Sequence, residues 1–168
     1  DHPNAKVKFK LGDVVTTQIA CANGETIILQ HDTNLPRPYS LGFRVQGTKG
    51  LWMDVNKSIH IEGKSKPHQW EEAKAWLEKY DHPLWKKYAA DTQGAGHGGM
   101  DFFVIHAFIE SVKRQTPTPQ DVYDAAAWSA ITPLSEISIA EEKMVDFPDF
   151  TNGQWKNRKN TFAIDDSY

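Results

Sequence analysis

The hydrophobic pattern of this chain changes near residue 69, and this change limits the folds that the chain can adopt. Before it, Val, Thr and Ile are concentrated in two short runs at residues 13–22 and 25–31, which Asn23 and Gly24 separate. Asn-Gly between two such runs is a strong hairpin signal, because both turn residues then adopt positive φ. After the change, apolar residues recur every three or four positions, which is typical of amphipathic helices. The order predicts an antiparallel sheet followed by helices.

Three further strands are expected to extend the sheet into an antiparallel meander. Residues 41–46 and 51–55 form a hairpin across residues 47–50, and residues 58–63 alternate polar and apolar side chains. His60 lies on the polar face of this fifth strand and is expected to be an ordinary surface residue. We therefore predict the α+β class, with an open, mainly antiparallel β-sheet and helices packed on one of its faces.

The helical part of the chain is divided by its start and stop signals. Residues 69–80 form one amphipathic helix, and Pro83 begins a short second helix. The sequence T-P-Q-D at residues 118–121 is a typical helix start, and Pro133 is expected to end or kink that helix. A last strand is expected at residues 144–147. The helix after residue 100 is predicted to bury a stripe of apolar side chains, namely Phe102, Ile105, Ile109 and Val112.

Length and composition favour a single globular domain. The chain has 168 residues, 39% of them hydrophobic, and a net charge of -3, which argues against a disordered chain and against a nucleic-acid partner. We assign residues 1–155 to one α+β domain and residues 156–168 to a polar C-terminal tail. No apolar run is long enough to span a membrane. Because the chain begins with Asp1 rather than Met, we expect that it is cut from a longer protein.

A glycine-rich loop at residues 94–101, G-A-G-H-G-G-M-D, leads into an apolar helix. Four of its eight residues are Gly, so the backbone can approach another group closely. One interpretation is a tight strand-to-helix turn. The other places His97 and nearby backbone N–H groups against a polar small molecule at the helix N-terminus. The six Trp residues of the chain are a weak hint of carbohydrate binding.

A second segment, residues 34–40, has the sequence N-L-P-R-P-Y-S and forms neither a regular strand nor a helix. Its two prolines fix φ and remove backbone donors, which makes the segment stiff. Arg37 and Tyr39 therefore extend from it in set directions. The segment is either a rigid connector or a loop that grips a sugar or a carboxylate with a planar cation and a phenol.

Several common catalytic motifs are absent from the sequence. There is no G-x-G-x-x-G after a strand, no Walker loop and no G-x-S-x-G elbow. The seven His and the single Cys show no metal-ligand spacing, so we predict no metal. A pair of glycosidase carboxylates cannot be recognised from spacing alone. We therefore assign no catalytic residue and no cofactor-binding residue.

Taken together, the motifs resemble a known family. The meander with V-Q-G-T-K-G at residues 45–50 and the G-H-G-G-M-D loop before a helix resemble the C-terminal domain of the Gfo/Idh/MocA superfamily. The chain is most similar to glycoside hydrolase family 109. The segments that carry this similarity include H-D-T-N-L-P-R-P-Y-S at residues 31–40, D-V-Y-D-A-A-A-W-S at 121–129 and F-P-D-F-T at 147–151.

The resemblance implies an NAD-dependent α-N-acetylgalactosaminidase. In that family NAD oxidises the 3-hydroxyl of the sugar, the aglycone leaves by elimination, water adds, and the ketone is reduced back. The Rossmann domain that binds NAD would precede Asp1, so the chain alone is expected neither to hold NAD well nor to turn over substrate. Tyr39 matches the family's sugar-contacting tyrosine, and we predict Tyr39, Arg37 and His97 as substrate-binding residues.

The resemblance also implies partners and a location. The expected partners are an N-acetylgalactosamine-type glycan, the protein's own N-terminal Rossmann domain and a second copy that packs through the sheet. The resemblance implies that the protein is periplasmic or secreted and bacterial. Two alternatives stay open: the same domain of a sugar oxidoreductase that uses NAD(P) as a co-substrate, and a stand-alone sugar-binding or dimerisation module. Residues 31–40 favour the glycosidase, since general superfamily members do not typically carry this segment.

Overall fold

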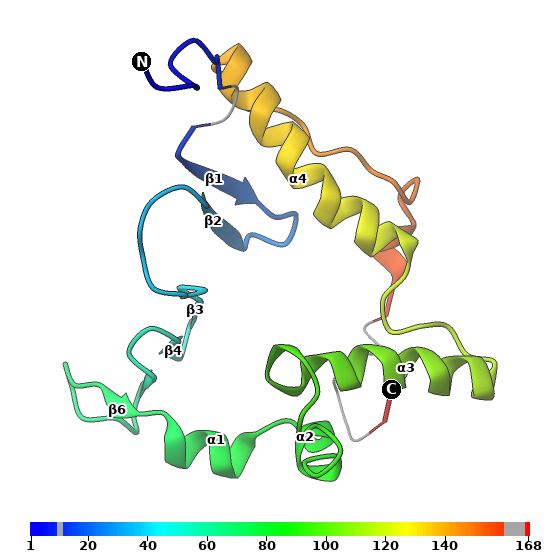
Figure 1. The fold of residues 1–168 in the computed structure, drawn as a ribbon. Helices are drawn as coiled ribbons and strands as arrows, with labels where there is room; N and C mark the ends of the chain where they lie inside the picture. The colour runs from blue at the N-terminus through cyan, green and yellow to red at the C-terminus, as the bar shows by residue number, and fades with distance from the viewer. Residues whose placement is uncertain (10–11, 160–166) are drawn as a thin grey trace. The chain divides into compact units, whose positions relative to one another are not determined.

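The computed structural model describes residues 1–9, 12–159 and 167–168. The chain divides into two compact units, and each is described by itself. The first comprises Asp1–Pro38 and Val122–Gly153, and the second comprises Tyr39–Asp121 and Gln154–Tyr168. The described part holds open antiparallel sheets and four α-helices, which confirms the predicted α+β class. Figure 1 traces these elements along the chain. Residues 160–166 of the predicted tail lie outside the described residues.

The first unit is built on a β-hairpin. Strands β1 (Val14–Ala20) and β2 (Thr26–Asp32) pair antiparallel along their whole length. The hairpin is where the Asn-Gly signal predicts it, but the turn differs from the prediction because Gly24 has positive φ and Asn23 does not. The Gly24 N–H donates to the Cys21 carbonyl at 3.0 Å, which closes a turn one residue longer than expected.

Helix α4 (Val122–Glu141) belongs to the same unit and lies along the hairpin (Figure 1). Side chains on one face of β1 are half-buried, and from this face the Thr17 hydroxyl lies 2.8 Å from the Ser135 hydroxyl of α4. The helix begins at Val122 rather than within residues 118–121, and it continues through Pro133. Of the two outcomes predicted for this proline, ending or kinking the helix, the first is therefore wrong, because its missing N–H removes only one backbone hydrogen bond.

The predicted strand at residues 144–147 is also wrong. These residues are irregular, and the described backbone offers them no neighbouring strand. A short apolar run becomes a strand only when its N–H and C=O groups find a partner edge.

The second unit contains a four-stranded antiparallel sheet in the order β3-β4-β5-β6. Its strands share no ladder with the β1–β2 hairpin, so the predicted single meander is divided into two sheets among the described residues. The strands are β3 (Arg44–Gly47), β4 (Gly50–Met53), β5 (Ser58–Ile61) and β6 (Glu71–Glu72).

Two details of this sheet correct the sequence analysis. Glu71 and Glu72 pair with β5, so helix α1 (Lys74–Tyr80) starts five residues later than residue 69. Pairing with the available edge of β5 outweighs the helical preference of the glutamates in this segment. His60 of β5 is half-buried, and its Nδ1 lies 2.9 Å from the Gln69 carbonyl, so it is not an ordinary surface residue.

The helices of the second unit pack through aromatic side chains. Helix α2 (Pro83–Lys87) is followed by the 3-10 turn η1 (His97–Gly99) and by α3 (Met100–Arg114); a further 3-10 turn, η2 (Gln154–Asn157), lies near the C-terminus. Rings from α2, Tyr88 and α3 meet edge to face or tilted, with centroids 4.6 to 5.5 Å apart for the closest pairs. These rings belong to Trp85, Tyr88, Phe102, Phe103 and His106.

The predicted buried stripe of α3 is largely wrong. Phe102 is half-buried, but Ile105, Ile109 and Val112 are exposed, and the helix instead buries the face that carries Ala107 and Ser111. Two adjacent faces of this helix are apolar, and residue spacing does not show which of them meets α2.

Few apolar side chains are fully buried in the described part of the chain. The buried hydrophobic residues are Ala73, Leu84 and Ala107. Many large apolar side chains on β2 and α3 are exposed. No described helix is both long and apolar enough to cross a membrane.

Candidate functional site

The loop after β2 is held by its own polar contacts. The Leu35 N–H donates to Asp32 Oδ1 at 3.2 Å, and the Asn34 amide donates to Asp13 Oδ1 at 3.1 Å. The Arg37 guanidinium lies over the same carboxylate, with Nε 3.4 Å from Asp32 Oδ2, and it also donates to the Asp32 carbonyl. These contacts of Arg37 hold the loop in place.

Tyr39 follows this loop and opens the second unit. Its side chain is 90% exposed, so its hydroxyl is accessible to a ligand from solvent. A tyrosine side chain has only two χ angles, so ordering it on a ligand costs little conformational entropy. The position is therefore compatible with the predicted substrate contact.

His97 lies in the glycine-rich loop, at the start of η1. Three successive residues adopt positive φ, His97 at 51°, Gly98 at 68° and Gly99 at 101°. His97 Nδ1 lies 2.8 Å from Asp101 Oδ1, and the His97 side chain is 82% exposed. The local pair fixes the ring through Nδ1 and keeps the imidazole accessible to solvent.

The loop does not have the architecture of a dinucleotide site. It follows α2 and a series of turns rather than a strand, so the interpretation as a strand-to-helix turn is wrong. A Cβ placed on Gly96 would lie 2.3 Å from Asp101 Oδ2, so this carboxylate covers the backbone of the loop at Gly96, ahead of η1. A pyrophosphate approaching there would meet a negative charge. The loop therefore does not fit the phosphates of NAD.

The three predicted residues are divided between the two units. Arg37 belongs to the first unit, whereas Tyr39 and His97 belong to the second. The cavities described below are lined by other residues. Among the described residues, no cluster of three or more His, Cys, Asp or Glu is arranged to hold a metal ion.

Replacing His97 by asparagine tests whether this side chain serves a ligand. Asparagine tolerates the left-handed backbone, and an exposed ion pair contributes little to stability. In the full-length protein we expect lower kcat/KM with a change in Tm of about 1–2 °C. A large drop in Tm with normal kcat/KM would assign His97 to structure instead.

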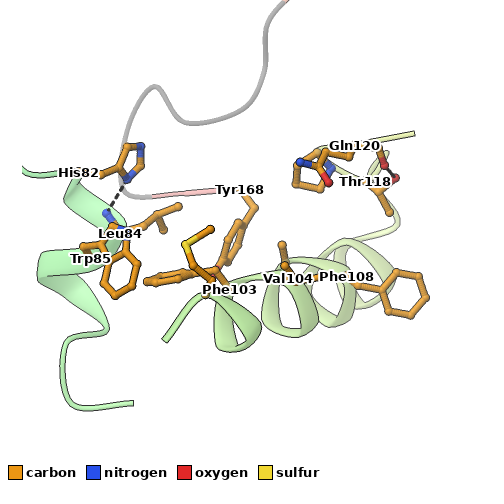
Figure 2. A pocket seen from close by; sticks show the side chains of 12 residues that line it. His82, Leu84, Trp85, Phe103, Val104, Phe108, Thr118, Gln120 and Tyr168 are labelled. Carbon is orange, nitrogen blue, oxygen red and sulfur yellow. Dashed lines mark hydrogen bonds between the residues drawn. The ribbon is translucent and has the colours of Figure 1, made fainter. Parts of the chain in front are cut away.

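An apolar cavity of about 470 Å³ lies between α2, α3 and residues 118–120. Figure 2 shows its lining, with Tyr168 beside Phe103 and with His82 over the start of α2. His82 Nδ1 accepts from the Leu84 N–H at 3.1 Å, so a neutral ring carries its proton on Nε2. That Nε2 is buried and has no hydrogen-bond partner among the described residues.

Tyr168 lies beside His106, and sequence analysis missed this contact. The Tyr168 hydroxyl is 2.9 Å from His106 Nδ1, and the rings meet edge to face. Burial disfavours the phenolate and raises the pKa of Tyr168 to about 12, and Tyr88 and Glu110 add to the increase. The one feature of the sequence that points to Tyr168 is that it is an aromatic residue at the end of a polar segment.

The raised pKa of Tyr168 predicts how stability varies at high pH. Because the folded state favours the neutral phenol, its contribution is fully present below about pH 10, the ordinary tyrosine pKa, and is lost as the pH rises toward 12. Absorbance titration near 295 nm should show one phenol that ionises later than the others. The late transition should disappear in Tyr168→Phe; if it persists in that variant, this account of Tyr168 is wrong.

Two carboxylates of the second unit are held in their ionised form. A hydrogen bond from Ser65 and another from Trp76, whose Nε1 is 3.0 Å from Oε2, lower the pKa of Glu71. A hydrogen bond from Lys113 at 3.0 Å likewise lowers the pKa of Glu110. A general acid needs a raised pKa near neutral pH, so neither group suits that role.

The comparisons with known proteins identify the class of this chain. Residues 1–157 match the family model described as "Glycosyl hydrolase 109, C-terminal domain". The chain therefore belongs to glycosyl hydrolase family 109, as its motifs indicate.

Individual relatives agree with this result. A "Glycosyl hydrolase family 109 protein" of Stenotrophomonas maltophilia is 68% identical over 99% of this chain and 37% of its own length. An "Alpha-N-acetylgalactosaminidase" of Tannerella forsythia is 56% identical over 98% of this chain and 35% of its own length. A family 109 protein of Parabacteroides distasonis is also 56% identical. The chain thus spans about a third of the length of these relatives.

Proposed function

We propose that this chain is the C-terminal, substrate-contacting part of a glycosidase that releases terminal α-linked N-acetylgalactosamine. The observation that carries the proposal is the 56% identity, over nearly all of the chain, to a relative named for that activity. The exposed Tyr39 beside a stiffened loop supports it. In this proposal the Tyr39 hydroxyl hydrogen-bonds a sugar oxygen and Arg37 keeps the loop in place.

We also propose that the activity depends on NAD and that NAD is bound outside this chain. The glycine-rich loop does not fit dinucleotide phosphates, because the Asp101 carboxylate covers the backbone at Gly96. The relatives are nearly three times as long as the region that they share with this chain, which leaves room for a cofactor domain. The resemblance to family 109 further favours an exported bacterial protein.

The test compares the full-length protein that contains this chain with the 168-residue chain alone. We expect the full-length protein to hydrolyse 4-nitrophenyl α-N-acetylgalactosaminide, to lose activity when NAD is removed and to regain it when NAD is restored. Absorbance at 340 nm should stay flat during turnover. Steady accumulation of NADH without release of nitrophenol would favour the sugar oxidoreductase instead. Hydrolysis by the 168-residue chain alone would contradict the proposed site of NAD.

We further propose that the protein self-associates through its sheets. Three consecutive apolar residues of β2, Ile27, Ile28 and Leu29, are exposed, although a strand usually exposes one face only. A self-complementary two-fold contact is the simplest way to cover such a face. Light scattering on the full-length protein at micromolar concentration should give the mass of a dimer, and Ile28→Lys should reduce it. A monomer at all concentrations would contradict this proposal.

A further inference from the structure

A second cavity of the second unit, with a volume of about 480 Å³, has a more polar lining than the first. One wall is the turn that joins β3 to β4, and the other is the segment that precedes β6. We call this cavity the β-turn cleft. Its side chains include one acid, three bases, two amides and one indole. The groups used below are Lys49, His60, Glu62, His68, Gln69 and Trp70.

A hydrogen bond fixes the tautomer of the neutral His60 ring, which lines this cleft. Its Nδ1 is 2.9 Å from the Gln69 carbonyl, and a carbonyl oxygen only accepts hydrogen bonds. The proton of a neutral His60 ring is therefore on Nδ1, and Nε2 is an acceptor. Because the ring is half-buried and tied to the opposite wall, it presents this acceptor with little loss of rotamer freedom on binding.

Backbone contacts hold the two walls of the cleft. The Glu62 N–H donates to the Lys49 carbonyl at 3.0 Å, which continues the β4–β5 pairing into the turn. A Cβ on Gly50 would lie 2.9 Å from the His60 carbonyl, so β4 and β5 approach closely there. The Gln69 N–H donates to the Lys66 carbonyl at 3.1 Å and closes the turn of the second wall. Backbone hydrogen bonds, including those of the sheet, therefore hold both walls of the cleft in position.

The chemistry of the lining defines the ligand. Lys49 supplies a cation and Glu62 an anion, so with neutral histidines their charges offset each other. The cleft offers donors, acceptors and the flat indole of Trp70, which is 46% exposed. The C–H groups on one face of a pyranose ring pack on an aromatic face, while its hydroxyls both donate and accept hydrogen bonds. A phosphate or carboxylate ligand would instead need an excess of cations.

We propose that the β-turn cleft is a binding site for a neutral sugar ring, with Trp70 as the stacking surface and His60 Nε2 as a fixed acceptor for a hydroxyl. The site is separate from the residue set Tyr39, Arg37 and His97. It deepens the proposed function by giving the protein a second position for a glycan. It rests on that function only for the choice of N-acetylgalactosamine as the first probe.

The test labels the full-length protein with 5-fluorotryptophan and follows its fluorine NMR signals. Trp70→Phe assigns the Trp70 signal by its disappearance. N-acetylgalactosamine, galactose and inorganic phosphate are added separately at millimolar concentrations. We expect the Trp70 signal to shift with at least one of the two sugars and not with phosphate. A His60→Phe variant, which keeps the ring but removes the acceptor, should bind about tenfold more weakly.

Trp128→Phe is the matched control, because Trp128 is 57% exposed, belongs to the first unit and is not among the residues that line the cleft. It should leave the Trp70 shift unchanged. A Trp70 signal that responds only to phosphate, or to none of the probes, would overturn the inference, as would unchanged affinity in His60→Phe. Hydrolysis of the nitrophenyl glycoside by the unmodified protein is measured in parallel. Hydrolysis without cleft binding rejects this inference alone, and cleft binding without hydrolysis rejects the proposed function alone.

Discussion

Replacing Gly99 by alanine is expected to lower the free energy of unfolding by about 2–4 kcal/mol. Gly99 has φ of 101°, a conformation that residues with a Cβ rarely adopt. A Cβ there would also lie 2.9 Å from Thr92 Cβ and 3.1 Å from two ring carbons of Trp85. Backbone strain and steric overlap therefore act together, and the overlap falls on the aromatic cluster that holds α2 against α3.

Gly98 provides a matched control for this substitution. It also has positive φ, at 68°, but a Cβ on it would meet no other atom within 4 Å. Gly98→Ala should therefore cost only the backbone strain, about 1 kcal/mol. Urea unfolding of both variants in the full-length protein measures the difference. Equal losses for Gly98→Ala and Gly99→Ala would show that the contacts with Thr92 and Trp85 do not limit this position.

Tyr39→Phe is expected to reduce kcat/KM for the α-N-acetylgalactosaminide about 5- to 30-fold, which is about 1–2 kcal/mol of transition-state binding. The substitution removes one hydroxyl from a side chain that is 90% exposed, so Tm should barely change. The loss would report a hydrogen bond to the sugar rather than a change in folding.

Tyr80→Phe is the control for a general effect of losing a phenol hydroxyl. Tyr80 is also exposed, at the end of α1, where its ring stacks on Trp76. Steady-state kinetics of both variants in the full-length protein should show a loss for Tyr39→Phe only. Unchanged kinetics for Tyr39→Phe would show that the Tyr39 hydroxyl does not bind the substrate.

Local patterns in the sequence predicted most of the elements, and the errors come from interactions between distant residues. The Asn-Gly hairpin and the strands around residues 47–50 were found because turn chemistry and short apolar runs are local signals. Residues 71–72 have no local preference for strand, and they form β6 because the edge of β5 is available. For α3, the spacing showed an amphipathic helix but not which of its two apolar faces is buried.

Local sequence patterns also predict only part of the candidate site. Neighbouring prolines and glycines indicate Arg37, Tyr39 and His97 as candidate site residues. The structure adds the local pairs that fix Arg37 and His97. The β-turn cleft was not predictable, because residues 46–51 and 68–70 come together only when β4, β5 and β6 pair. The contact of His106 with Tyr168 spans 62 residues, so the aromatic residue that ends the polar segment does not by itself indicate its partner.

The most direct test of the central claim is the choice of substrate by the full-length protein. Initial rates are measured with 4-nitrophenyl glycosides of α-N-acetylgalactosamine, β-N-acetylgalactosamine and α-galactose under identical conditions. The proposed function predicts that kcat/KM is highest for the α-N-acetylgalactosaminide, and that Tyr39→Phe lowers this value. No hydrolysis of the α-N-acetylgalactosaminide, or a higher kcat/KM for either of the other two glycosides, would contradict the assignment.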